Sequence, residues 1–275
     1  MSERASMEPL DEFVEPIETT SESPSLAVGD VLKTPEDGTI YRIQRVVNFQ
    51  RWQPPYRIYE VTPEGKEGTC WLWEAPSKEV GEALRKEAEI FSQLNSNLFP
   101  RVYDQFEQDE RFYVLTDALP EKTLAEAMKQ GELSFPQFLS LLAQVAAALI
   151  QLHQSGWLHL GLRPECILVG KPIKLIDLRW AVRIGDKPQV HFFHAGYSPP
   201  ELIGTEISVD ERSDIFSVGA ILFHFVSGQP IPETGVQLTG LQLNYSGIPQ
   251  ILSRCLANNK EDRYHNAQIL HRELL

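Results

Sequence analysis

The chain has 275 residues, of which 42% are hydrophobic, and its formal net charge is −13. This length suffices for one two-lobed domain or two small ones, and an acidic surface disfavours nucleic-acid binding because it repels phosphate. No run of about 18 apolar residues and no basic, then apolar, N-terminal stretch is present, so we expect neither a transmembrane helix nor secretion. Three scattered cysteines fit neither a disulfide framework nor a metal site. We therefore expect a cytoplasmic protein.

Residues 1–28 are predicted to form a disordered acidic tail. Only Arg4 opposes the acidic residues of this segment, which are interspersed with Ser, Thr and Pro: Glu3, Glu8, Asp11, Glu12, Glu15, Glu18 and Glu22. A docking role, with Phe13 and Ile17 as anchors, is an alternative that no feature of the sequence selects.

Residues 29–117 are predicted to form a small lobe of five strands and one helix. Residues 29–39 are rich in turn formers. Five segments have strand-like composition, at residues 41–47, 56–61, 69–74, 102–106 and 112–117. The helix is expected at residues 79–94, between the third and fourth strands, because apolar residues recur there at helical spacing.

Residues 118–120 form a short connector, after which the pattern becomes helical up to residue 275. A short helix is predicted at residues 123–129, and Ser134 is a candidate N-cap of a long helix that ends at Ser155-Gly156. Further helices are predicted at residues 215–226, 248–256 and 266–274, the first of them apolar nearly all round and hence buried.

Several motifs follow one another over residues 38–275. They are Leu152-His153-Gln154-Ser155-Gly156-Trp157-Leu158-His159, then Gly161-Leu162-Arg163-Pro164-Glu165-Cys166-Ile167-Leu168, Ile176-Asp177-Leu178-Arg179, Gly196-Tyr197-Ser198-Pro199-Pro200-Glu201, Asp214-Ile215-Phe216-Ser217-Val218-Gly219, and Cys255-Leu256 with Asp262-Arg263. In order and spacing they resemble the motifs of eukaryotic-type (Hanks-type) serine/threonine protein kinases. The resemblance implies an α+β, bilobal protein kinase-like fold, with the five-stranded lobe first and a mainly helical lobe second.

The resemblance also implies structural contacts. Glu201 is expected to pair with Arg263, and such arginine–carboxylate pairs are often bidentate. Asp214 is expected to accept backbone hydrogen bonds from the loop around His159, and His159 to pack against Leu178.

Much of the chemistry of the family is missing from the first lobe. Phosphoryl transfer needs a covered phosphate pocket, a cation on the phosphates, Mg²⁺ ligands and a carboxylate that orients the hydroxyl. The loop at residues 48–55, where kinases have a glycine-rich sequence, contains no glycine, and only Arg51 offers a phosphate contact there. Trp73 stands where the family has its nucleotide lysine, so Trp71 would fill the adenine space; a shift by one residue would place Glu74 there instead.

In neither register does the strand supply a cation, and Lys66 or Lys78 would have to reach in from an unusual place. Glu87 matches the helix glutamate that normally pairs with the lysine. Without that lysine, Glu87 is predicted to be a solvated helix charge.

The catalytic loop is also altered. Gly161 stands at the position of the catalytic aspartate and has no side chain to orient a hydroxyl. Cys166 stands where the family has a Mg²⁺-binding asparagine, and sulfur is a poor ligand for this hard cation. Arg163 replaces a lysine. Asp177 retains the position of the main metal ligand, and we hypothesise that Arg179 pairs with Asp177 in place of Mg²⁺.

These losses together predict a catalytically inactive pseudokinase that acts as a signalling scaffold or allosteric protein-binding module. We expect no cofactor, no membrane and a protein partner of unknown identity. The aromatic segment at residues 190–194 either forms an exposed contact patch or packs inward. Two alternatives remain. The first is a divergent kinase, or a transferase of another group, that uses Asp177 and an acid such as Glu165 with ATP and Mg²⁺. The second is a nucleotide sensor without turnover.

Overall fold

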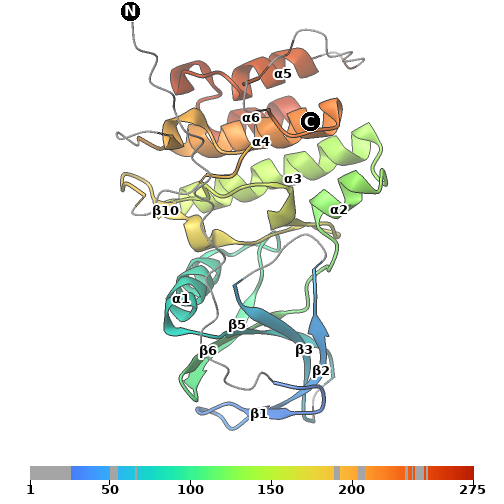
Figure 1. The fold of residues 1–275 in the computed structure, drawn as a ribbon, viewed down its shortest axis with the longest axis vertical. Coiled ribbons are helices and arrows are strands. Elements are labelled where there is room, and N and C mark those ends of the chain that lie inside the picture. The colour runs from blue at the N-terminus through green and yellow to red at the C-terminus, as the bar shows by residue number, and fades with distance from the viewer. Residues whose placement is uncertain are drawn as a thin grey trace, which may run out of the picture.

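The computed structural model describes residues 26–49, 55–65, 67–188, 193–203, 208–232, 235–236, 238, 245 and 247–275. Predictions for residues 1–25, Arg51, Lys66 and residues 190–192 therefore lie outside the described residues. Within them, a lobe made of a β-sheet and one helix adjoins a helical lobe (Figure 1). This is the bilobal α+β arrangement that the sequence predicts.

The first lobe contains a six-stranded antiparallel sheet with the strand order β1-β2-β3-β4-β6-β5. The strands are β1 (Val31–Lys33), β2 (Ile40–Val47), β3 (Arg57–Pro63), β4 (Cys70–Ala75), β5 (Val102–Gln108) and β6 (Arg111–Asp117). The sequence predicts five of them. The sixth, β1, lies in the segment predicted as turn-rich, because one buried residue, Leu32, between two exposed ones is too short an alternation to detect.

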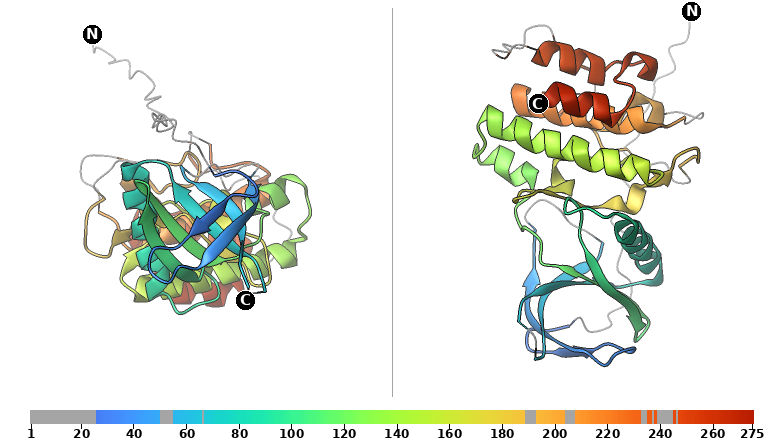
Figure 2. Two further views of the ribbon diagram at one scale, coloured as in Figure 1. Left: turned by 90° about the horizontal axis from the view of Figure 1, so that it is seen from below. Right: turned by 180° about the vertical axis from the view of Figure 1, so that it is seen from behind.

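Alternation along β4 divides the apolar residues of the first lobe between two faces of the sheet. Trp71 and Trp73 pack in one cluster with the apolar stripe of helix α1 (Lys78–Gln93), while Leu72 packs in a second cluster with Tyr59. The sheet is curled, and α1 lies against the outside of the curl (Figure 2). The second cluster packs on the opposite face of the sheet. The first cluster therefore lies on the face that meets α1 and the helical lobe.

Among its described residues, the second lobe contains five α-helices. They are α2 (Leu124–Lys129), α3 (Phe135–Gln154), α4 (Glu211–Ser227), α5 (Ile248–Cys255) and α6 (Ala267–Leu274), close to the predicted bounds. As predicted, α4 is buried almost all round, with every residue from Ser213 to Phe223 buried. Gly219 is required in this helix because a Cβ there would lie 2.4 Å from Cβ of Cys255 on α5.

Short strands hold the loops of the candidate site between the lobes. The pairs are β7 (Trp157–Leu158) with β10 (Val182–Arg183), and β8 (Ile167–Leu168) with β9 (Lys174–Leu175). The loop that contains Gly161 runs from β7 to β8, and Asp177 follows β9. The two pairs thus bring the motifs around residues 161 and 177 together under the sheet.

Helix α3 is long and apolar enough, by length and composition, to cross a membrane. Here 56% of its apolar window is buried, and its inward side chains belong to the main core of the second lobe. The helix therefore serves as the central core helix of that lobe.

Candidate functional site

Two tryptophans occupy the surface where the sheet meets the second lobe. Trp71 and Trp73 are 1% and 2% exposed. They share an apolar cluster with Leu119 of the connector, with Leu168 of β8 and with Ile176, which directly follows β9. Both indoles are therefore part of the packing between the lobes.

The indoles are fixed by aromatic and polar contacts. Nε1 of Trp73 donates a hydrogen bond to Oγ1 of Thr116 at 2.9 Å, so its polar atom is satisfied in the core. The ring centroids of Trp71 and Trp73 are 6.2 Å apart, and the ring of Tyr56 lies 5.3 Å from that of Trp73. The ring of Phe49 meets that of Trp71 edge-on, with the ring centroids 5.8 Å apart.

The other register considered for β4 is wrong. Glu74 faces the opposite side of the sheet, where it is fully buried and paired with Arg111. The hydroxyl of Tyr59 donates a second hydrogen bond to Glu74 at 2.5 Å. Glu74 is therefore a structural carboxylate of the curled sheet, and Trp73 is the one of the two residues that faces α1 and the second lobe.

The prediction that Glu87 is a solvated helix charge is wrong. Glu87 is 1% exposed and bridges three segments of the chain. The hydroxyl of Tyr56 donates to its Oε1 at 2.9 Å, and the backbone N–H of Leu178 donates to its Oε2 at 3.1 Å. In the family that the sequence resembles, the corresponding glutamate binds a lysine. Here the carboxylate of Glu87 instead accepts hydrogen bonds from a tyrosine and a backbone amide.

Burial, together with the negative charge of Asp177, raises the pKa of Glu87 to about 8. The neighbouring Lys86 directs its Nζ to the backbone carbonyl of Arg179 at 3.3 Å, and burial lowers the pKa of Lys86. Helix α1 is therefore attached to the segment after Asp177 by two adjacent side chains.

Asp177 lies between two arginines. It is fully buried and adopts a left-handed backbone conformation, with φ of 68°. Its Oδ2 lies 2.8 Å from Nη2 of Arg163, and its Oδ1 lies 2.6 Å from Nε of Arg179. The hypothesised ion pair between Asp177 and Arg179 is confirmed, and Arg163 adds a second one.

Electrostatics keep Asp177 ionised. Burial by itself would raise the pKa of its carboxyl, but Arg179 and Arg163 outweigh burial and hold this pKa well below its ordinary value. Sγ of Cys166 lies 3.6 Å from Oδ2 of the same carboxylate. Burial raises the pKa of Cys166 far above its usual range, so this sulfur is a thiol and not a thiolate.

The indole of Trp180, which the sequence analysis did not single out, fills the space where a side chain at Gly161 would lie. A Cβ built on Gly161 would lie 2.7 Å from Cδ1 of Trp180, which is closer than side-chain carbons approach. The carbonyl of Gly161 accepts a hydrogen bond from Nη1 of Arg163 at 3.0 Å. An aspartate at residue 161 would require the ring of Trp180 to move.

The contacts predicted for Asp214 are confirmed. Its carboxylate accepts the backbone N–H groups of His159 at 2.8 Å and Leu160 at 2.7 Å. His153 adds a third contact, with Nε2 2.8 Å from Oδ2 of Asp214. Although burial would lower it, hydrogen bonds to Asp214 and Glu211 raise the pKa of His153 to about 9, so this histidine is cationic at neutral pH.

His159 is fully buried, and burial lowers the pKa of its ring. It is therefore a neutral core side chain next to the loop that it begins. Its contact with Leu178 stays a prediction.

The predicted pair of Glu201 and Arg263 is also confirmed. Nη1 and Nη2 of Arg263 lie 2.7 and 2.8 Å from the two oxygens of Glu201, which is bidentate geometry. Ser213 donates to the same carboxylate at 2.8 Å. This pair joins the segment before α4 to the segment before α6.

The aromatic segment at residues 190–194 was predicted either to form an exposed patch or to pack inward, and its two described residues differ in this respect. Phe193 is 49% exposed, whereas His194 is half-buried with its Nε2 3.4 Å from Nη1 of Arg163. Burial and the positive charge of Arg163 lower the pKa of His194 to about 3. The neutral histidine thereby connects this segment to the loop that carries Gly161.

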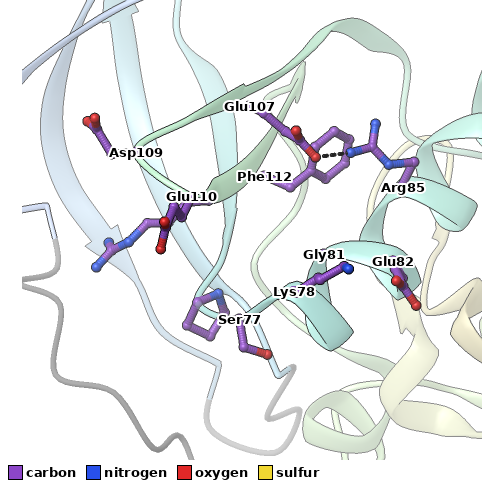
Figure 3. A pocket seen from close by; sticks show the side chains of 11 residues that line it. Ser77, Lys78, Gly81, Glu82, Arg85, Glu107, Asp109, Glu110 and Phe112 are labelled. Carbon is purple, nitrogen blue, oxygen red and sulfur yellow. Dashed lines mark hydrogen bonds and ion pairs between the residues drawn. The ribbon is translucent and has the colours of Figure 1, made fainter.

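A cavity of about 580 Å³ lies elsewhere, between the start of α1 and the turn from β5 to β6 (Figure 3). Lys78, a candidate for replacing the missing cation, lines this cavity. Arg85 spans the cavity wall, paired with Glu107 and stacked on the ring of Phe112 at 4.1 Å. The cavity therefore has mixed charge, and its lining includes neither Glu87 nor Asp177.

A family model described as protein kinase domain matches residues 73–275. The chain belongs to this family. The match begins in β4, so the first three strands are recognised as part of the kinase domain only by the structure, where they complete the sheet.

Relatives of this kinase domain include Aurora kinases at low identity. The Aurora kinase of Schizosaccharomyces pombe is 26% identical over 217 residues, which is 72% of this chain and 60% of that protein. Aurora kinase B of Xenopus tropicalis is 27% identical over 206 residues, 70% of this chain and 55% of that protein. The chain therefore corresponds to less than two thirds of either relative.

The kinase domain PknI of Mycobacterium tuberculosis has a similar fold. The crystal structure of that domain aligns with a TM-score of 0.68 at 21% identity, covering 91% of this chain and 98% of the other. This likeness establishes the bilobal fold of the present kinase domain.

Proposed function

We propose that this kinase domain is a pseudokinase that does not transfer phosphate and acts by binding another protein, as a scaffold or allosteric partner in signalling. The observation that carries the proposal is the packing of Trp71 and Trp73 between the lobes. Adenine binding in this family requires an open space on that face of the sheet, and here two buried indoles occupy it.

The metal ligands support the same conclusion. Mg²⁺ requires hard oxygen ligands in nearly ideal octahedral geometry. The one retained ligand, Asp177, has its oxygens held by Arg163 and Arg179, and the second position offers the thiol of Cys166. These residues do not fit a Mg²⁺–nucleotide complex, and two guanidinium groups balance the charge of Asp177 without a metal.

The catalytic carboxylate has no evident replacement. Gly161 lacks a side chain, and the indole of Trp180 covers its Cα. Glu165, the acid considered for a new role, lies 3.9 Å from Nε of Arg163 and thus near a cation. A positioned acid–base group typically contributes about 10²–10⁴-fold to a rate, and its loss alone would leave a very slow enzyme.

The contacts between the two lobes favour a single fixed arrangement of the lobes. In active kinases the lysine, the nucleotide and the metal join the lobes, and the position of the helix is regulated. Here Glu87 and Lys86 of α1 contact the second lobe directly, and Arg45 of β2 forms an ion pair with Glu121 after the connector. These contacts need no ligand, so the surface around α1 is available to a partner at all times.

A thermal-shift titration tests the absence of nucleotide binding. A ligand at 100 times its dissociation constant stabilises a protein by about 2.7 kcal/mol, which is a readily measured shift. We expect no shift with ATP, with or without Mg²⁺ or Mn²⁺. The matched variant Trp71→Ala/Trp73→Lys reopens the space and restores a cation, and an active serine/threonine kinase domain serves as the positive control.

Saturable stabilisation of the wild type by ATP would overturn the proposal, and radiolabelled phosphate transfer that disappears in Asp177→Ala would establish an enzyme. If neither occurs, affinity capture compares the wild type with Glu87→Ala, which releases α1. A partner that recognises the fixed position of α1 is captured by the wild type alone. Identical captured proteins for both forms would contradict a role of that surface.

A further inference from the structure

A single hydroxyl connects the sheet to helix α1 at Glu87. Tyr56 directly precedes β3, and its ring lies 5.3 Å from that of Trp73 on the face of the sheet that meets α1. The hydroxyl donates to Oε1 of Glu87 at 2.9 Å, and no other donor to this oxygen is present among the described residues. Burial raises the pKa of Tyr56 well above its usual range, so the hydroxyl keeps its proton and remains a donor.

The other oxygen of Glu87 is bound to the second lobe. Oε2 accepts the backbone N–H of Leu178 at 3.1 Å, and Nζ of the adjacent Lys86 donates to the carbonyl of Arg179 at 3.3 Å. Glu87 is thus a bridge with one end on the sheet and the other on the segment that follows Asp177. A buried carboxyl that loses a donor keeps the cost of its desolvation without the bond that offset it, so the closed arrangement becomes less favourable.

Apolar contacts hold α1 to both lobes. Val80 and Leu84 pack on the sheet beside the tryptophans, whereas Ile90 and Phe91 pack in the main core of the second lobe. Movement of the second half of α1 away from the second lobe would expose the latter two side chains, at a cost, and would bring Glu87 into water, which can replace its two donors. The apolar contacts oppose this movement, and the bond from Tyr56 decides how strongly Glu87 opposes it as well.

We infer that the hydrogen bond from Tyr56 to Glu87 is a latch that keeps α1 closed on the second lobe, and that α1 and the backbone of Leu178 open as one unit when it breaks. Loss of one such buried bond shifts the equilibrium between closed and open forms by about tenfold, which changes the population of the open form without complete release. A protein that binds the open form more tightly would shift the same equilibrium towards it. The inference does not depend on the proposed function, because the latch is present whether or not a partner binds.

The test is backbone hydrogen exchange, measured by NMR on the isotope-labelled full chain with Tyr56→Phe, which keeps the buried ring and removes only the hydroxyl. The matched control is Tyr59→Phe, which removes a similarly buried hydroxyl that donates to Glu74 at 2.5 Å on the opposite face of the sheet. Amides of the second half of α1 and of Leu178 should exchange about tenfold faster than in the wild type in Tyr56→Phe, and less than about twofold faster in Tyr59→Phe.

Two further measurements complete the test. In the wild type, the amide of Leu178 and those of the second half of α1 should show the same opening free energy and the same denaturant dependence, and this result needs no variant that must fold. In a Glu87→Ala background, Tyr56→Phe should change exchange in α1 by less than about twofold, because its acceptor is already absent.

Three outcomes would overturn the inference. The first is unchanged exchange of α1 in Tyr56→Phe. The second is equal acceleration of α1 in Tyr56→Phe and Tyr59→Phe, which would show that α1 opens only when the whole domain unfolds and that Tyr56 has a structural role alone. The third is a different opening free energy for Leu178 and for α1 in the wild type.

Discussion

Replacement of Asp177 by alanine should cost this kinase domain much of its stability. In the wild type this carboxylate balances Arg163 and Arg179, whose side chains are 13% and 18% exposed. Removal of one partner from a buried ion pair typically costs about 3–5 kcal/mol, because the other charge stays in the protein without compensation. The arginines are near the surface and gain some hydration, so we expect about 3 kcal/mol, a large share of a typical stability of about 5–15 kcal/mol.

Urea denaturation followed by circular dichroism measures this loss. The control is Asp186→Ala, at an exposed site, which should change the free energy of unfolding by less than about 0.5 kcal/mol. The double variant Asp177→Ala/Arg179→Ala should recover part of the loss, because it removes one of the two uncompensated charges. A loss below about 1 kcal/mol for Asp177→Ala would show that the arginines do not depend on the carboxylate, and would refute the reasoning.

Three further variants test the site. Gly161→Asp, which restores the family residue, should lower the free energy of unfolding by about 1–3 kcal/mol through the clash with Trp180, and calorimetry should show recovery when Trp180→Ala is added. The raised pKa of Glu87 contributes stability that is complete below the pKa of the unfolded state and is lost as pH rises through the pKa of the folded state. Glu87→Gln should therefore flatten the decline of stability between about pH 4.5 and 8. An unchanged pH profile would count against a protonated Glu87. His153→Gln should likewise remove a decline between about pH 6.5 and 9, because His153 loses its proton, and with it the ion pair to Asp214, over that range.

The order of the motifs predicted the second lobe well, because its architecture depends on a few pairs of residues, each of which has a specific partner. Glu201 with Arg263 and Asp214 with the loop at His159 form the contacts that their positions implied. The register of β4 was also predictable, since the alternation of large apolar residues places Trp71 and Trp73 on one face.

Apart from Arg179, which was predicted to pair with Asp177 in place of Mg²⁺, the sequence did not show which residues replace the lost groups. Glu87 was expected in solvent because its lysine is missing, but Tyr56, which is distant in sequence, satisfies it across the sheet. Trp180 gave no sign that its ring would cover Gly161, because that contact depends on how two loops meet. The signals in the sequence were weak. Tyr56 is an aromatic residue just before a strand, and Trp180 is a large residue directly after Arg179.

The positions of the tryptophans give this kinase domain a built-in optical probe. The chain has five tryptophans, and Trp71 and Trp73 lie in the apolar contact between the lobes. Nε1 of Trp157, in the second lobe, donates a hydrogen bond to Oε1 of Gln93 at the end of α1. Separation of the lobes would move these indoles from an apolar to an aqueous environment. Intrinsic emission should therefore shift to longer wavelength when the lobes part, so that opening can be followed in real time without a label.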